Sequence, residues 1–277
     1  MLKLGEFQKL TIAREQPQGF YLEDDEGNEV LLPGAYCTRE MDLDDEIEVF
    51  VYADSSDKVV ATTETPFLTV GQFAFLEVTD VNQHGAFCDW GITKELFVPF
   101  RNQAGKLQAN LSYVVHLLVD EKSNRLVGTT KLSTFLEKSA GEEIEMGQKV
   151  DLLVYYVTEL GYKVIVNQKY AGLVYKNEVS EPLHPGQKLN GYVKPIRIDG
   201  KIDISINPVG YHNVEPEAQK ILDKLDANKG FLPFTDKSNP ELIRKEFGVS
   251  KKMFKKSIGA LYREEIILIK EDGIYKV

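Results

Sequence analysis

The sequence has few of the residues that mark disulfide-stabilised or metal-binding proteins. It contains two cysteines, Cys37 and Cys88, in 277 residues, and its four histidines are scattered along the chain. Neither cysteine has metal-ligand spacing to a partner, so we expect reduced thiols, no metal site and no cofactor. His116 lies in an apolar strand pattern, and we expect it to pack in the interior.

Long apolar runs and catalytic motifs are also missing. No apolar stretch approaches the ~20 residues that span a bilayer, and no basic segment leads into an apolar one at the N-terminus. The sequence therefore predicts no membrane partner and a cytoplasmic location. It has no P-loop, no Gly-x-Gly-x-x-Gly after a strand pattern and no nucleophile–histidine–acid set in a motif context. We therefore expect that the protein is not an enzyme.

Positive charge is scarce as well, because the net charge is −10, and this argues at first against a nucleic-acid partner. The excess of negative charge lies in one part of the chain. Residues 1–66 hold 16 acidic and 5 basic residues, a net charge of −11, whereas residues 67–140, 141–210 and 211–277 carry 0, −1 and +2. The first block would repel a phosphate backbone, and it is either a solubilising face or a surface for a protein partner. The later blocks can each carry a basic face.

Short β-branched and aromatic runs separated by turn residues dominate the rest of the composition. Between Gly71 and Thr130 such runs follow one another with no long helical period between them. About five strands in about 60 residues fit a small closed barrel.

The same pattern occurs three times along the chain. Each copy opens on a glycine, and 28 positions later it has a residue that follows an apolar pair. The glycines are Gly5, Gly71 and Gly147, and the later residues are Pro33, Pro99 and Tyr175. Three identical offsets predict a mainly β fold of three tandem five-stranded barrels. We place them at residues 1–65, 66–140 and 145–208, with the first barrel acidic and divergent.

The hydrophobic period changes after Pro208. Three helical stripes follow, the second capped by Asn239 with Pro240 in its first turn and the third capped by Ser250. A hairpin with a two-residue Asp272-Gly273 turn comes after them. Three helices followed by a hairpin predict an α/β winged helix over residues 213–277, in which the third helix is the usual recognition helix.

The expected third helix carries lysines on the side away from its apolar stripe. They are Lys251, Lys252, Lys255 and Lys256. A groove-reading helix would expose them to nucleic acid, single-stranded or duplex. They also fit a solvated face, or a domain that docks on the third barrel or on a protein.

Two groups of residues carry a resemblance to a known family. Gly85-Ala86-Phe87 at the start of a strand and Leu96-Phe97-Val98-Pro99 in the next resemble the S1 subclass of the OB-fold. The C-terminal matches are Asp236-Lys237-Ser238-Asn239-Pro240, Phe247-Gly248-Val249-Ser250-Lys251, Phe254-Lys255-Lys256 and Gly259-Ala260-Leu261. Together they resemble the bacterial conserved virulence factor B family. The resemblance implies three S1-type domains followed by a winged helix, binding of single-stranded RNA and an influence on gene expression.

The resemblance implies a set of RNA-binding residues in the second and third barrels. In S1-like barrels, two rings at the entry to the second strand stack on bases; here those positions are His84 and Phe87. Candidate phosphate contacts in the second barrel are Lys94, Arg101, Arg125 and Lys131. In the third barrel the candidates are Tyr162, Lys163, Tyr175, Lys176, Lys194, Arg197 and Lys201.

Two positions in these barrels have alternative interpretations. Strand alternation puts Tyr162 and Lys163 on opposite faces, so at most one of them faces RNA. Trp90, the only tryptophan, is either a stacking platform or a ring packed at an edge of the barrel.

Three functions remain open from the sequence. The first is a regulator that binds single-stranded RNA through barrels two and three. The second is a DNA-binding transcription regulator that acts through the winged helix. The third is a scaffold whose acidic first barrel binds a protein.

Overall fold

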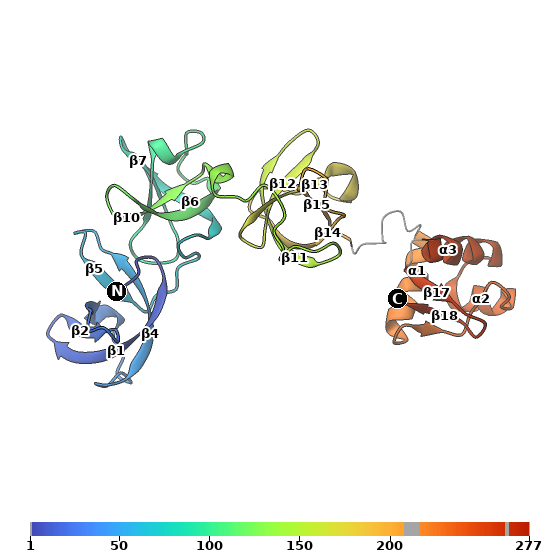
Figure 1. Ribbon diagram of the computed structural model, residues 1–277, viewed down its shortest axis with the longest axis horizontal. Helices are drawn as coiled ribbons and strands as arrows, with labels where there is room; N and C mark the ends of the chain where they lie inside the picture. Colours follow the sequence, from blue (N-terminus) through green and yellow to red (C-terminus); the bar gives the residue numbers. More distant parts are fainter. Residues whose placement is uncertain (1, 208–215, 264–265, 277) are drawn as a thin grey trace. The chain divides into compact units, whose positions relative to one another are not determined.

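The computed structural model describes residues 2–207, 216–263 and 266–276. Its mainly β part is followed by a small α/β domain (Figure 1). Two compact units divide the chain, one of residues 1–141, 150–190 and 197–202, the other of residues 142–149, 191–196 and 203–277. The predicted end of the third barrel at 208 and start of the winged helix at 213 lie outside the described residues. None of the helices in the described part is long and apolar enough to cross a membrane.

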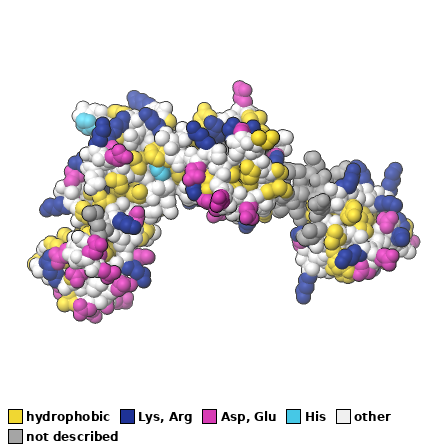
Figure 2. All heavy atoms as spheres, viewed as in Figure 1, with side chains coloured by type: hydrophobic (Ala, Val, Ile, Leu, Met, Phe, Trp, Pro, Cys, Tyr) yellow, Lys and Arg dark blue, Asp and Glu magenta, His cyan; other side chains and the backbone are white. Residues whose placement is uncertain are grey.

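The first barrel is closed, with strand order β1-β2-β3-β5-β4. Its strands are β1 (Phe7–Gln16), β2 (Gly19–Glu23), β3 (Glu29–Pro33), β4 (Glu46–Ala53) and β5 (Val59–Thr62), and a short 3-10 helix, η1 (Gly34–Tyr36), follows β3. Acidic side chains spread over the face of this barrel that Figure 2 shows.

The second barrel repeats the strand order with one difference. Its elements are β6 (Phe73–Val81), β7 (Gly85–Cys88), β8 (Leu96–Pro99), η2 (Phe100–Asn102), β9 (Ser112–Asp120), β10 (Arg125–Thr129) and η3 (Leu132–Thr134). They form one five-stranded sheet in the order β10-β9-β6-β7-β8. Within residues 66–140, all of them described, β8 and β10 therefore end the sheet without a ladder between them. The prediction of a five-stranded barrel is confirmed, although hydrogen bonds between strands do not close it at this seam.

The third barrel is closed in the order β11-β12-β13-β15-β14. Its elements are β11 (Lys149–Val157), β12 (Gly161–Val166), β13 (Tyr170–Tyr175), η4 (Lys176–Glu178), β14 (Lys188–Val193) and β15 (Ile202–Ser205). The strand order matches that of the first barrel, so the prediction of a repeated five-stranded fold is confirmed.

Glycine conformation explains the 28-residue spacing. Gly5, Gly71 and Gly147 have φ angles of 79°, 88° and 81°, in the left-handed region that favours glycine. A second glycine opens the second strand of each barrel and lies opposite the residue that ends the third strand. These pairs are Gly19 with Pro33, Gly85 with Pro99 and Gly161 with Tyr175. A Cβ on the second glycine would lie 2.0–2.4 Å from a carbonyl oxygen of the third strand, so only glycine fits there.

The winged helix contains α1 (Pro216–Ala227), β16 (Phe231–Leu232), α2 (Pro240–Phe247), α3 (Lys251–Arg263), β17 (Ile267–Ile269) and β18 (Ile274–Lys276). The predicted caps are confirmed, because the Asn239 side chain accepts from the Glu241 amide and Gly248 ends α2 with φ 70°. The predicted hairpin turn is wrong by one residue. Ile269 pairs with Ile274 and the Lys270 amide donates to the Gly273 carbonyl, so the two loop residues are Glu271 and Asp272.

The first and second barrels share one hydrophobic core. Phe50, Tyr52 and Val60 of the first barrel belong to the same buried cluster as the interior of the second. Trp90 is 2% exposed, and its ring packs edge-on against Phe50 with centroids 5.7 Å apart. Of its two interpretations, the packed one is confirmed, and the ring sits where two barrels meet.

The second barrel buries a histidine between two phenylalanine rings. His116 is 5% exposed, with its ring 4.4 Å from that of Phe73 and 4.3 Å from that of Phe135. Burial lowers the pKa of His116 to about 4. The expectation that His116 packs in the interior is confirmed.

This histidine predicts a pH-dependent stability. Between pH 6.5 and about 4 the unfolded chain binds a proton at His116 that the folded chain does not, so stability falls as the pH falls through this window. Between pH 6.5 and 5 the loss is at most about 2 kcal/mol. We expect the melting temperature of the wild type to fall further than that of His116→Phe when the pH is lowered from 7.5 to 5. Parallel pH profiles for the two proteins would contradict this assignment.

Candidate nucleic-acid interface

The second barrel presents an aromatic pair on the face formed by its second and third strands. Alternation along β7 and β8 buries Ala86, Cys88, Leu96 and Val98 and leaves the rings of Phe87 and Phe97 half-buried on the outer side. The two residues lie directly opposite each other, and their ring centroids are 5.2 Å apart. In OB-folds this face is the one that binds oligonucleotides.

A cavity of about 520 Å³ lies beside the aromatic pair. Its rings come from Phe87, Phe97, the exposed His84, Trp90 and Tyr52, and its charged side chains are those of Lys94, Arg125, Asp57 and Glu95. The second barrel supplies most of the wall, and the first barrel supplies Tyr52, Ala53, Ser55 and Asp57. Four predicted residues, His84, Phe87, Lys94 and Arg125, therefore meet at one place.

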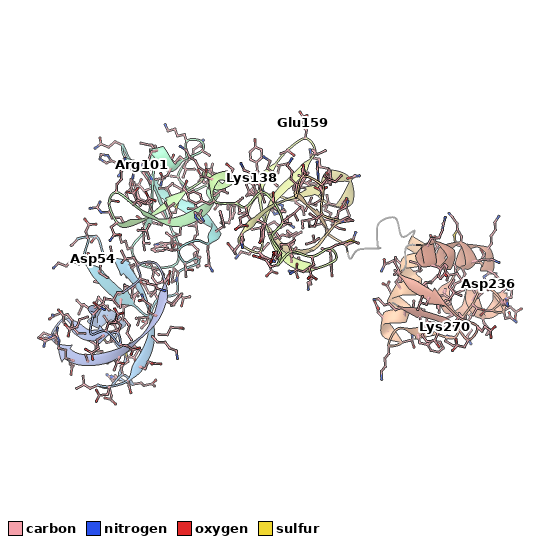
Figure 3. All side chains as sticks on the ribbon, viewed as in Figure 1. Asp54, Arg101, Lys138, Glu159, Asp236 and Lys270 are labelled. Atoms are coloured by element: carbon pink, nitrogen blue, oxygen red, sulfur yellow. The ribbon has the colours of Figure 1, made fainter. Side chains whose placement is uncertain are left out.

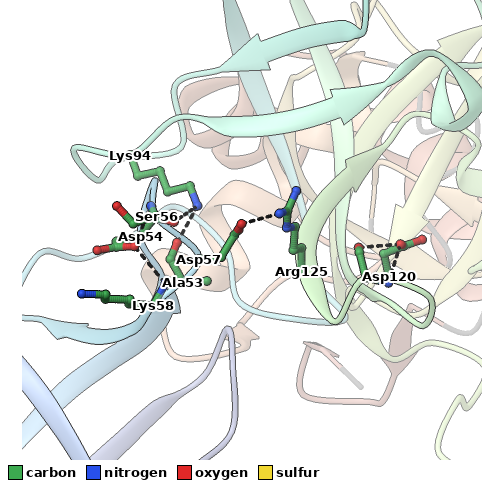
Figure 4. Close-up of polar contacts among 9 residues, drawn as sticks. Ala53, Asp54, Ser56, Asp57, Lys58, Lys94, Asp120 and Arg125 are labelled. Atoms are coloured by element: carbon green, nitrogen blue, oxygen red, sulfur yellow. Dashed lines mark hydrogen bonds and ion pairs between the residues drawn. The ribbon is translucent and has the colours of Figure 1, made fainter.

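The first barrel holds both cations of this cavity through its β4–β5 loop (Figure 4). The Arg125 guanidinium is paired with the Asp57 carboxylate. The Lys94 ammonium donates to the carbonyl oxygens of Ala53 and Asp54, at 2.6 and 2.8 Å. Burial lowers the pKa of Lys94 from its ordinary value. We call residues Asp54–Lys58 the capping loop.

The capping loop has a defined conformation. The Asp54 carboxylate accepts hydrogen bonds from the amides of Ser56 and Lys58, and Asp57 has φ 61°. Figure 3 shows Asp54 on the side of the first barrel nearest the second. The loop is therefore folded so that its backbone carbonyls and the Asp57 carboxylate reach the cations of the second barrel.

Arg101 lies apart from this cavity. It follows β8 in η2, is exposed and pairs with the Asp120 carboxylate at 2.7 Å. Hydrogen bonds from Ser123, together with this guanidinium, lower the pKa of Asp120.

In the third barrel Tyr162 and Lys163 lie on opposite faces of β12, as strand alternation predicts. Tyr162 is 4% exposed and packs in the interior, while Lys163 is exposed on the outer side. Tyr175 ends β13 half-buried, opposite Gly161, and the exposed Lys176 begins η4. The ring of Tyr162 is therefore not at the surface, whereas Lys163, Tyr175 and Lys176 reach it.

The other third-barrel cations lie between β14 and β15. Arg197 and Lys201 are both bonded to Asp199, at 3.2 and 2.9 Å, and Lys194 is half-buried. The hydrogen bond from Lys201 is the main cause that lowers the pKa of Asp199.

The winged helix exposes its lysines on α3 as predicted. Phe254, Ser257, Ile258 and Leu261 form the buried side of the helix. Lys252, Lys255 and Lys256 are exposed and Lys251 is half-buried. Lys255 lies 3.2 Å from the Asp236 carboxylate.

The sequence analysis missed one member of the aromatic pair. The sequence pattern marks Phe97 only as part of a strand, whereas the Gly85–Pro99 pairing puts it opposite Phe87. Because the two strands are antiparallel, counting two residues forward from Gly85 and two back from Pro99 leads to Phe87 and Phe97.

Comparisons with known proteins agree with this architecture. The S1 domain family matches residues 4–64, and the CvfB-like winged helix domain family matches residues 219–275. Thus the S1 match falls on the barrel that the sequence analysis treated as divergent.

The chain is similar over nearly its whole length to curated bacterial proteins. It is 26% identical to conserved virulence factor B of Staphylococcus epidermidis, over 98% of this chain and 94% of that protein. It is 25% identical to YitL of Bacillus subtilis, over 95% of this chain and 90% of that protein. The resemblance to the conserved virulence factor B family is confirmed.

A solved structure has a similar fold. It is a multidomain protein with nucleic acid binding domains from Streptococcus pneumoniae, with a TM-score of 0.50 and 26% identity, covering 99% of this chain and 98% of that one. S1 and winged-helix domains are of a nucleic-acid-binding, non-catalytic kind.

Proposed function

We propose that this protein binds single-stranded RNA through its second and third barrels and its winged helix, and that it regulates gene expression by binding rather than by catalysis. The observation that carries the proposal is the Phe87–Phe97 pair beside Lys94 and Arg125, on the oligonucleotide-binding face of an OB-type barrel. Aromatic rings next to cations suit single strands, because unpaired bases stack on the rings while the cations meet the phosphates.

The comparisons support the proposal at the level of domain type. S1 and winged-helix families match the two ends of the chain, and a structure described as having nucleic acid binding domains is similar to all of it. The regulatory role rests on the similarity to proteins named as virulence factors. The proposal places this activity in the cytoplasm.

The proposed modules are residues 1–65, 66–140, 145–208 and 213–277. The proposed RNA contacts at the surface are His84, Phe87, Lys94, Arg101, Arg125, Lys163, Tyr175, Lys176, Lys194, Arg197, Lys201, Lys251, Lys252, Lys255 and Lys256. The acidic first barrel contributes no contact of its own, and it remains a candidate surface for a protein partner.

A filter-binding comparison of three nucleic acids tests the proposal. The wild-type protein is titrated with single-stranded RNA, single-stranded DNA and duplex DNA of the same length at two salt concentrations. We expect RNA to bind most tightly, with affinity that falls as salt rises. Tightest binding of duplex DNA would instead support a transcription regulator, and no binding of any of the three would refute the proposal.

The capping loop predicts a gain of affinity from a single substitution. In Asp57→Asn the carboxylate that holds Arg125 is removed, so Arg125 becomes available to a phosphate. An exposed ion pair contributes about 0.2–1 kcal/mol, so RNA affinity should rise by roughly 1.5- to 5-fold. The measurement is a titration of full-length protein with a labelled single-stranded RNA.

Asp25→Asn is the matched control for this prediction. It removes the same charge from the first barrel at an exposed position in the β2–β3 turn. If both variants gain affinity equally, the effect is a general loss of repulsion and the capping loop has no specific role.

A further inference from the structure

A second groove lies where the second and third barrels meet. Its volume is about 710 Å³, which is within the ~300–1,000 Å³ of typical ligand sites. The fourteen described residues that line it include three tyrosines, three lysines and no aspartate or glutamate. These six residues are Tyr113, Tyr155, Tyr156, Lys106, Lys131 and Lys163.

The two walls of this junction groove are fastened to each other. The Gln168 side chain accepts from the Phe73 amide at 2.7 Å and donates to the Phe73 carbonyl at 3.1 Å. Beside this clamp, Leu132 and Leu136 from the second-barrel side pack with Leu153 and Ile165 of the third in one buried cluster. The groove is therefore a built feature of the fold.

Tyr156 is placed in the groove by an irregularity in β11. The register between β11 and β12 shifts between Val154 and Tyr156, as at a β-bulge, which re-aims the side chains that follow it. Tyr156 is 58% exposed and pairs across the strands with Lys163, whose ammonium lies 5.8 Å from the ring centroid. The result is an exposed ring with a cation beside it.

The first barrel also pairs a cation with an aromatic ring at this position, but there the cation is on the first strand and the ring is on the second. There Arg14 follows the register shift on β1 and lies 3.7 Å from the ring of Tyr21 on β2. That arginine is also bonded to Glu29 in a two-point contact. In the third barrel the ring comes from the first strand and the cation from the second, and no acidic residue lines the groove around them.

We propose that the junction groove binds a segment of single-stranded nucleic acid, with a base stacked on Tyr156 and phosphates next to Lys106, Lys131 and Lys163. This inference rests on the proposed function and adds a site between barrels to the faces already described. The groove has three cations and no carboxylate, so it suits a polyanion. A base can stack on the exposed Tyr156 ring only if it is unpaired, which favours a single strand. Lys131 is held at the rim, because its ammonium donates to the Arg101 carbonyl at 2.6 Å.

Fluorescence anisotropy of full-length protein with a labelled oligouridylate, over a series of salt concentrations, tests the site. Tyr156→Ala should weaken binding about 5- to 150-fold with little change in salt dependence, whereas Tyr156→Phe, which keeps the ring, should bind like the wild type. Lys106→Gln/Lys163→Gln should lower the slope of log affinity against log salt by about 1.4. Lys3→Gln/Lys220→Gln removes the same charge at exposed positions outside the groove and should leave the slope nearly unchanged.

Circular dichroism and melting temperature verify folding, and three outcomes overturn the inference. If folded groove variants bind like the wild type, the groove is not a site, although the proposed function stands. If they keep oligouridylate binding and lose binding of a polyglutamate peptide, the groove takes an acidic peptide instead. If the wild type binds neither single-stranded RNA nor single-stranded DNA, the proposed function fails together with the groove.

Discussion

Trp90→Ala should destabilise the first and second barrels together by about 3–5 kcal/mol, the range typical of large-to-small changes of a buried aromatic residue. The ring is 2% exposed, packs against Phe50 of the first barrel and donates from its indole nitrogen to the Lys94 carbonyl. Its loss leaves a cavity in a core that both barrels share. Denaturation followed by far-UV circular dichroism measures the effect.

Trp90→Phe is the control for this prediction, because it keeps one aromatic ring against Phe50 and leaves a smaller cavity than alanine does, although the indole nitrogen is lost. It should cost much less than the alanine variant. A loss confined to the second barrel, with the first melting as in the wild type, would show that the shared core does not couple them.

Charge reversal on α3 should have the largest effect on binding. In Lys252→Glu/Lys255→Glu/Lys256→Glu, three exposed cations of the recognition helix become anions. If each meets a phosphate of single-stranded RNA, the salt slope falls by about 2, which corresponds to roughly 50-fold weaker binding at about 0.15 M salt. Repulsion by the new carboxylates adds to this loss. A salt titration with labelled RNA measures both quantities.

A second triple variant separates a local effect from a global one. Lys220→Glu/Lys229→Glu/Lys245→Glu changes the charge of the same domain equally at exposed positions outside α3. We expect it to bind much more tightly than the α3 variant. Equal losses in the two would mean that net charge, and not the helix, governs binding.

The repeated barrels could be predicted from sequence because their spacing has a local cause. Gly5, Gly71 and Gly147 each adopt a left-handed conformation two residues before the first strand of their barrel. The helix caps at Asn239 and Gly248 are likewise local rules. Such features need only a few neighbouring residues, so a single sequence reveals them.

The contacts of the sites could not be predicted, because they join residues that are distant in the chain. Asp57 and Arg125 are 68 positions apart, and no local pattern pairs them. In the third barrel the ring is on the first strand, at Tyr156, and the cation is on the second, at Lys163. Lys163 therefore occupies the position that Phe87 has in the second barrel, so a role assigned by position in one barrel does not apply to the other. The seam between β8 and β10 also depends on tertiary packing that turn and strand propensities do not determine.

The capping loop gives the second barrel an internal competitor. Because Asp57 is part of the same chain as Arg125, it acts at an effective concentration in the millimolar range, as for short tethers, whatever the protein concentration. Under the proposed function RNA must displace Asp57, so the apparent affinity of the second barrel would be below its intrinsic one. Added salt weakens the competitor as well as the ligand, and the second barrel should therefore lose less affinity with salt than a face whose cations have no acidic neighbour. The second barrel would then be a weaker site, occupied mainly when the ligand is already bound to another domain of the protein.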